Sequence, residues 1–131
     1  MESRLHPTSD SRALLIDLNA EAGGQLVEQL NRAGFRTDIA VSWSAARAAL
    51  SANYYHSCIV VADLNQAANL EQLDQLRRAA LRVWIIVVSD LQPDNVRAVA
   101  PGIDAAISAS FSMADLTARL AAFSLRARPA F

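Results

Sequence analysis

Three short runs of consecutive apolar residues set the strongest limit on what this chain can fold into. The runs are Ala13–Ile16, Cys58–Ala62 and Val83–Val88, and each is followed directly by a polar residue. A run this short that is apolar at every position is typical of a strand buried on both faces. Such strands occur mainly in parallel sheets covered by helices on both sides, so the runs predict an α/β fold.

The segments between the runs complete a regular alternation of strands and helices. Apolar residues recur at helical spacing in five segments, 22–33, 45–50, 70–76, 94–100 and 113–123, and two further segments, 35–41 and 105–107, predict strands. Gly34 is a stop signal for the first helix, and Ser42 or Ser44 can cap the second. The order βαβαβαβαβα predicts a flavodoxin-like, doubly wound domain with a five-stranded parallel sheet in the order 2-1-3-4-5. We expect this domain over residues 12–126, with a flexible N-terminal tail over 1–11 and a C-terminal tail over 127–131.

Composition and charge exclude several classes of function. The chain has 131 residues, of which 53% are hydrophobic and 19% charged, so it can fill one core and is too apolar to be disordered. The net charge of −1 provides no strong field for direct binding of nucleic acid or of an anionic membrane. All 12 basic residues are arginine, which excludes mechanisms that need a Schiff-base lysine or a P-loop lysine.

Cysteine, histidine and long apolar stretches are scarce. Cys58 is the only cysteine, so an internal disulfide and a cysteine-based zinc site are excluded, and His6 and His56 lie far apart in the sequence. No apolar stretch approaches the roughly 20 residues of a membrane span. Met1–Asp10 lacks the apolar core of a signal peptide. We therefore expect a cytoplasmic protein.

Polar side chains follow the three apolar runs at the point where each predicted strand ends. Asp17 and Asp63 end the first and third strands, which are neighbours in a sheet of this order, so we expect their carboxylates to converge. Two carboxylates close together favour a divalent cation such as Mg²⁺ or a shared proton, and the backbone carbonyl of Asn65 can add a further oxygen. The hydroxyl of Ser89 can contact an oxyanion held at Asp63. This pattern is typical of phosphoryl transfer onto a carboxylate.

Each of these residues also has an ordinary structural explanation. Aspartate often ends a strand in α/β folds because it favours turns and helix starts. Trp84 is expected in the core and Trp43 at partial burial, while the aromatic turn Tyr54–His56 either packs internally or contacts a partner. Arg77–Arg78 and Arg82 are explained by a favourable interaction with a helix C-terminus, with anion binding as the alternative.

Four stretches of the chain, in their order and spacing, are similar to one known family. They are ALLIDLNAE, CIVVADLN, WIIVVSD and GIDAAISASFS. From Arg12 to Leu125 the chain resembles the receiver domain of bacterial response regulators, the CheY-like family. The resemblance implies that Asp63 is the phospho-acceptor, that Ser89 is the switch hydroxyl, and that Mg²⁺ binds near Asp17 and Asp63. It also implies two-component phosphorelay signalling, with a sensor histidine kinase or another signalling protein as the partner.

Departures from the family pattern bear on whether the chain can be phosphorylated. Leu18 takes the position of the second acid, which supplies a metal ligand in the family, and Asn19 follows it as a partial substitute. Ala109 stands where the family has a lysine, and Ala106 falls on the aromatic switch position. The resemblance therefore implies weakened Mg²⁺ binding and impaired or absent phosphorylation of Asp63.

Three functions stay open from the sequence, and we favour the first. It is an atypical receiver, or pseudo-receiver, that acts by protein–protein contact rather than by catalysis. The second is a conventional receiver that a histidine kinase switches at Asp63 with Mg²⁺. The third is a small-molecule-binding or enzymatic domain, which no Gly-rich phosphate loop supports. We also expect the last helix and the Ala-rich fifth strand to permit a homodimer.

Overall fold

The computed structural model describes residues 12–18, 23–108 and 111–124. Five strands and five helices alternate along the chain: β1 (Arg12–Asp17), α1 (Gly23–Arg32), β2 (Arg36–Ala40), α2 (Trp43–Ala52), β3 (Ser57–Val61), α3 (Ala67–Ala79), β4 (Trp84–Ser89), α4 (Pro93–Val99), β5 (Ala105–Ser108) and α5 (Met113–Ser124). All strand pairs are parallel, and the strands lie in the order β2-β1-β3-β4-β5. The predicted fold class and strand order are confirmed. The two predicted tails, over 1–11 and 127–131, lie outside the described residues.

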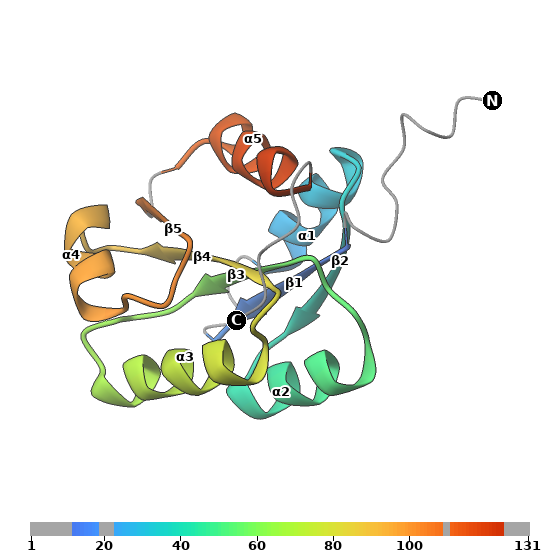
Figure 1. Cartoon of the computed structure of the whole chain (residues 1–131). Coiled ribbons are helices and arrows are strands. Elements are labelled where there is room, and N and C mark those ends of the chain that lie inside the picture. The colour runs from blue at the N-terminus through green and yellow to red at the C-terminus, as the bar shows by residue number, and fades with distance from the viewer. Residues whose placement is uncertain (1–11, 19–22, 109–110, 125–131) are drawn as a thin grey trace.

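The sheet lies between two layers of helices (Figure 1). Alternation along β1 explains the layers, because Leu14 and Ile16 pack on the face covered by α2, α3 and α4, whereas Leu15 packs on the face covered by α1 and α5. Every residue of β4 is buried, as expected for a strand covered on both faces. Trp84, predicted in the core, stacks on Phe123 of α5 with ring centroids 4.4 Å apart.

Local signals explain where individual elements begin and end. Gly34 follows α1 with a φ of 102°, a left-handed conformation that glycine adopts without steric cost and that commonly ends a helix. Ser42, rather than Ser44, caps α2, because its hydroxyl accepts a hydrogen bond of 3.0 Å from the backbone N–H of Ala45. β3 begins one residue earlier than its apolar run, since Ser57 pairs with Ala13 of β1 even though it is polar.

A buried arginine closes the amino-terminal edge of the sheet, where β4 and β5 begin. The guanidinium of Arg77, at the end of α3, pairs with Asp104 at 2.8 Å, and both side chains are almost inaccessible to solvent. It also donates to four backbone carbonyl oxygens of the surrounding turns, those of Ala80, Leu81, Val83 and Gly102. Asp104 in turn accepts a 2.8 Å hydrogen bond from the backbone N–H of Ile85. Ala80 and Leu81 follow α3, so Arg77 contacts the turn just beyond its helix, and its charged partner is Asp104.

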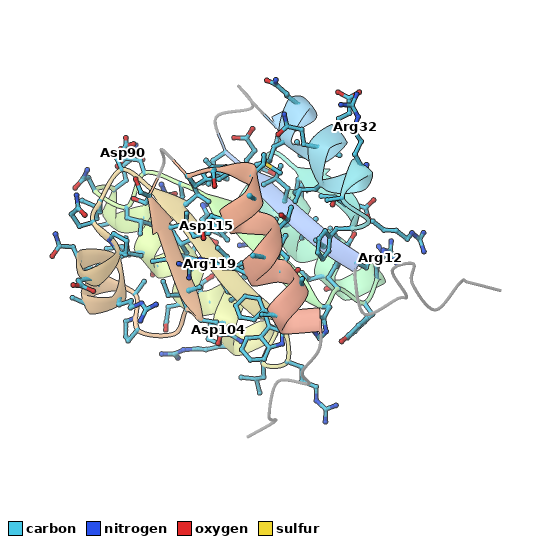
Figure 2. The ribbon with its side chains drawn as sticks, turned by 90° about the horizontal axis from the view of Figure 1, so that it is seen from above. Arg12, Arg32, Asp90, Asp104, Asp115 and Arg119 are labelled. Atoms are coloured by element: carbon cyan, nitrogen blue, oxygen red, sulfur yellow. The ribbon has the colours of Figure 1, made fainter. Side chains whose placement is uncertain are left out.

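A second polar cluster ties the amino-terminal ends of β1 and β3 to β2. The hydroxyl of Tyr55 donates to the Asp38 carboxylate at 2.6 Å, and the Arg12 guanidinium donates to the same oxygen at 3.1 Å. Arg12 also lies over the Tyr55 ring, 4.9 Å from its centroid. The Tyr55 hydrogen bond holds the pKa of Asp38 below its usual value, while burial and that same bond raise the pKa of Tyr55 to about 12. Figure 2 shows Arg12 and Asp104 at this edge and Asp90 at the opposite end of β4.

Candidate functional site

The polar residues singled out from the sequence lie at the carboxyl-terminal edge of three adjacent strands. Asp17 is the last residue of β1, is only 4% exposed, and lies opposite Val61, the last residue of β3. Asp63 follows two residues later and is exposed. Ser89 is the last residue of β4 and is buried. Because β1, β3 and β4 are neighbours in the sheet, one edge carries all three residues.

The carboxylate of Asp63 organises the loop that leads into α3. Its Oδ1 accepts a hydrogen bond of 3.0 Å from the backbone N–H of Asn65, and its Oδ2 lies 3.4 Å from the side-chain nitrogen of Gln66. Aspartate favours this kind of turn, in which its carboxylate accepts a hydrogen bond from the backbone N–H of the residue two positions later. Asp63 therefore has the ordinary structural role considered for it, and its exposed carboxylate is accessible from solvent as well.

Asn69 connects this loop to α2, a connection that the sequence pattern does not indicate. Its side-chain nitrogen donates to the backbone carbonyl of Asp63 at 2.9 Å, and its side-chain oxygen accepts from the indole N–H of Trp43 at 3.0 Å. Trp43 is partly buried, as expected, and packs against the core on the α2–α3 face. The only available signal was a polar amide in the first turn of α3, which is common on any exposed helix.

The hydroxyl of Ser89 is already engaged within its own loop. Its Oγ accepts a 3.1 Å hydrogen bond from the backbone N–H of Leu91. Ser89 lies opposite Ser108 of β5 and is only 4% exposed. Ala106, at the position where the family has an aromatic residue, is buried in β5 beside Val87. Ala109, at the family's lysine position, lies outside the described residues, as does Asn19.

The residues at this edge fit a divalent cation only in part. Asp17 and Asp63 supply two carboxylates, but Leu18 adds an apolar side chain that packs against the core on the α2–α3 face. Within residues 12–18, 23–108 and 111–124, no group of three or more His, Cys, Asp or Glu side chains is placed to hold a metal ion. Hard cations bind more tightly as carboxylate ligands are added, so this donor set is poor for Mg²⁺. The carbonyl ligand predicted at Asn65 stays a prediction.

Known structures resemble the chain over most of its length. No family model matches the chain, and no curated protein matches it in sequence. The orphan response regulator HP1043 of H. pylori superposes with a TM-score of 0.72 and is 25% identical, over 92% of this chain and 100% of that one. This chain has the receiver-domain fold. The CheY-like receiver domain from Methylobacillus flagellatus is also 25% identical, with a TM-score of 0.65 over 86% of this chain and 97% of that one.

A third receiver structure holds the ligands that the family resemblance implies. The response regulator TrrA from Thermotoga maritima, in complex with Mg²⁺ and beryllofluoride, has a TM-score of 0.70 and 20% identity, over 86% of this chain and 97% of that one. At that identity the similarity concerns the fold. In the described part of the present receiver domain, no helix is long and apolar enough to cross a membrane.

Proposed function

We propose that this chain is an atypical receiver domain of bacterial two-component signalling that acts through protein–protein interaction, with impaired or absent phosphorylation at Asp63. The observation that carries the proposal is the position of Leu18. Its side chain packs into the apolar core at the point where the family resemblance calls for a metal-binding acid. The receiver fold is thus retained while the charge that would hold Mg²⁺ is reduced.

Two electrostatic losses act in the same direction. One fewer carboxylate lowers the affinity for a hard cation, because that affinity depends on the negative charge of the ligands. The sequence also contains no lysine at any position, so the ammonium that contacts the phosphoryl group in the family has no replacement of its own type. A charge-assisted hydrogen bond of this kind contributes about 1.5–3 kcal/mol. An acyl phosphate at Asp63 would therefore form slowly and be poorly coupled to the rest of the fold.

The partners that we propose are signalling proteins. A sensor histidine kinase or another signalling protein fits a receiver domain, and one similar structure is the orphan response regulator HP1043 of H. pylori. A homodimer through α5 and β5 is a second proposed contact, since β5 is an edge strand of the sheet. We propose that the domain works in the cytoplasm, without a catalytic activity of its own and without direct contact to nucleic acid or membrane.

Treatment with small phosphodonors tests the proposal. The protein is incubated with acetyl phosphate or beryllofluoride, with and without millimolar Mg²⁺, and followed by intact mass and by amide NMR shifts. We expect little or no mass increase and no Mg²⁺-dependent shift. A Mg²⁺-dependent change that disappears in Asp63→Asn would establish a working phospho-acceptor and overturn the atypical assignment.

The alternative is a conventional receiver, and the exposure of Asp63 is the observation that favours it. In that case a carboxylate oxygen of Asp63 attacks the phosphorus of a phosphohistidine, the phosphorus–nitrogen bond breaks, and the imidazole leaves. A pair of variants separates the two possibilities. If Leu18 limits metal binding, Leu18→Asp should show Mg²⁺-dependent amide NMR shifts. Leu18→Asn, whose side chain has the shape of aspartate but no charge, should not show them. Equal responses of the two variants and the native protein would contradict the role assigned to Leu18.

A further inference from the structure

A groove lies at the amino-terminal edge of the sheet, between the C-terminal ends of α2 and α3. Asp63 lies at the other edge. The groove encloses about 260 Å³. Its walls come from the end of α2, the aromatic turn before β3 and the turn before β4, and include Leu50, Tyr54, Tyr55, Leu81, Arg82 and Val83. Nothing in the proposed function uses these residues, although the aromatic turn was already notable in the sequence.

Two of the large hydrophobic side chains that line the groove are exposed. Tyr54 is 50% exposed and Leu81 is 45% exposed, and both belong to the small set of large hydrophobic side chains that are strongly exposed in the described part of the chain. Tyr55 also lines the groove, but only 2% of its surface is exposed. Exposed apolar side chains that gather around a concavity, rather than scatter singly, mark contact sites in soluble proteins. Tyrosine and arginine are also the residues that most often dominate the energy of such contacts.

The charge of the groove is positive. Arg82 is the only charged residue among those that line it, and it is exposed. The backbone carbonyl groups of the turn after α3 would partly offset this charge, but the guanidinium of Arg77 already occupies those of Ala80 and Leu81. Across residues 12–18, 23–108 and 111–124, no salt bridge involves Arg82. An occupant with a carboxylate beside an apolar side chain would therefore complement the groove.

We infer that this groove binds an acidic, amphipathic segment of a partner protein, with an apolar side chain between Tyr54 and Leu81 and a carboxylate on Arg82. The inference rests on the proposed function as an interaction module, and it specifies where the module is contacted. The groove and Asp63 lie at opposite edges of the sheet, so binding here does not require phosphorylation. A partner could then be held constantly, as an atypical receiver requires.

A peptide pair of defined composition tests the inference on the full chain. One twelve-residue amphipathic helix carries glutamate on its polar face and leucine and phenylalanine on the other, and the second has lysine in place of every glutamate. Titration of each peptide is followed by amide NMR shifts and by fluorescence anisotropy. We expect the glutamate peptide alone to shift the amides of Leu50, Tyr54, Leu81 and Arg82. Arg82→Glu should weaken its binding about fivefold or more, as expected for reversal of one exposed ion pair.

Matched variants distinguish the groove from the rest of the surface. Val99, on α4, is 46% exposed and serves as the control for Leu81, and the exposed Arg97 serves as the control for Arg82. We expect Leu81→Ser to weaken binding while Val99→Ser and Arg97→Glu leave it unchanged. Equal affinity for the two peptides, equal effects of the paired variants, or shifts confined to another surface would each overturn the inference. The phosphodonor experiment measures phosphorylation at Asp63 and does not involve the peptides. A failure of the proposed function would therefore be recognised independently of the peptide titrations.

Discussion

Replacement of Arg77 should cost this small domain a large part of its stability. The side chains of Arg77 and Asp104 are 12% and 9% exposed, and their charged groups lie 2.8 Å apart. In Arg77→Met the apolar stem of the side chain is kept, but the carboxylate stays buried without its counter-ion. Four carbonyl oxygens lose a charged donor as well. Breaking a buried ion pair from one side costs about 3–5 kcal/mol, against a total of about 5–15 kcal/mol for a domain.

A double-mutant cycle identifies the physical origin of that cost. If the unpaired carboxylate dominates, then neutralising it in Arg77→Met/Asp104→Asn should recover about 1–2 kcal/mol relative to Arg77→Met alone. The asparagine oxygen can still accept the hydrogen bond that the backbone N–H of Ile85 gives to Asp104. Urea unfolding followed by tryptophan fluorescence and by circular dichroism provides the free energies of unfolding.

Arg78 provides the matched control from the same helical turn. It pairs with Asp74 at 3.0 Å, but these two side chains are 78% and 61% exposed. An exposed pair one helical turn apart contributes about 0.3–0.5 kcal/mol, so Arg78→Met should be nearly neutral. Equal losses in Arg77→Met and Arg78→Met would refute the argument that burial makes the difference. A double variant less stable than Arg77→Met would refute the role of the unpaired carboxylate.

Three further predictions concern other parts of the fold. Because the pKa of Tyr55 is raised to about 12 from an ordinary value of 10.0, its contribution to stability is complete below pH 10 and decreases as the pH rises to 12. In urea unfolding across this pH range, Tyr55→Phe should flatten the decline by roughly 2 kcal/mol, and an unchanged decline would contradict this. Burial also raises the pKa of the Cys58 thiol to about 12, so a disulfide reagent at pH 8 should label it only after urea is added, and rapid labelling of the folded protein would contradict its burial. Asn69→Ala removes both the hydrogen bond to the carbonyl of Asp63 and the one from the indole N–H of Trp43, and should cost about 1–2 kcal/mol in urea unfolding. An unchanged free energy of unfolding would show that this connection is dispensable.

The apolar runs made the sheet predictable, because burial on both faces leaves an uninterrupted pattern in the sequence. The runs at 13–16, 58–62 and 83–88 correspond to β1, β3 and β4, shifted by one residue at most at each end. Those small shifts arise because a ladder of backbone hydrogen bonds does not depend on side-chain polarity. Ser57 belongs to β3 because it pairs with both Ala13 and Trp84, although it is polar.

The polar links were not predictable, because each joins residues distant in sequence. Arg77 and Asp104 lie 27 residues apart, and Trp43 and Asn69 lie 26 apart. In a helical pattern such residues simply occupy polar positions, and nothing in the sequence indicates that tertiary packing will bury or connect them. The edge that carries Asp17, Asp63 and Ser89 followed from strand order alone. Their chemical roles depend on distances and ligands, which strand order does not contain, and these roles stay predictions.

The distribution of these polar links explains how a receiver fold can lose part of its phosphorylation site without losing stability. Two polar links, Arg77 to Asp104 and Tyr55 to Asp38, lie at the amino-terminal edge of the sheet, and the side chains of the first are only 12% and 9% exposed. At the carboxyl-terminal edge, Leu18 and Ala106 stand where the family pattern has an acid and an aromatic residue, and both pack with the core on the α2–α3 face. Leu18 adds apolar contact there instead of a carboxylate that would repel Asp17 and Asp63. We therefore expect substitutions at this edge to change metal and phosphate binding more than the stability of the fold.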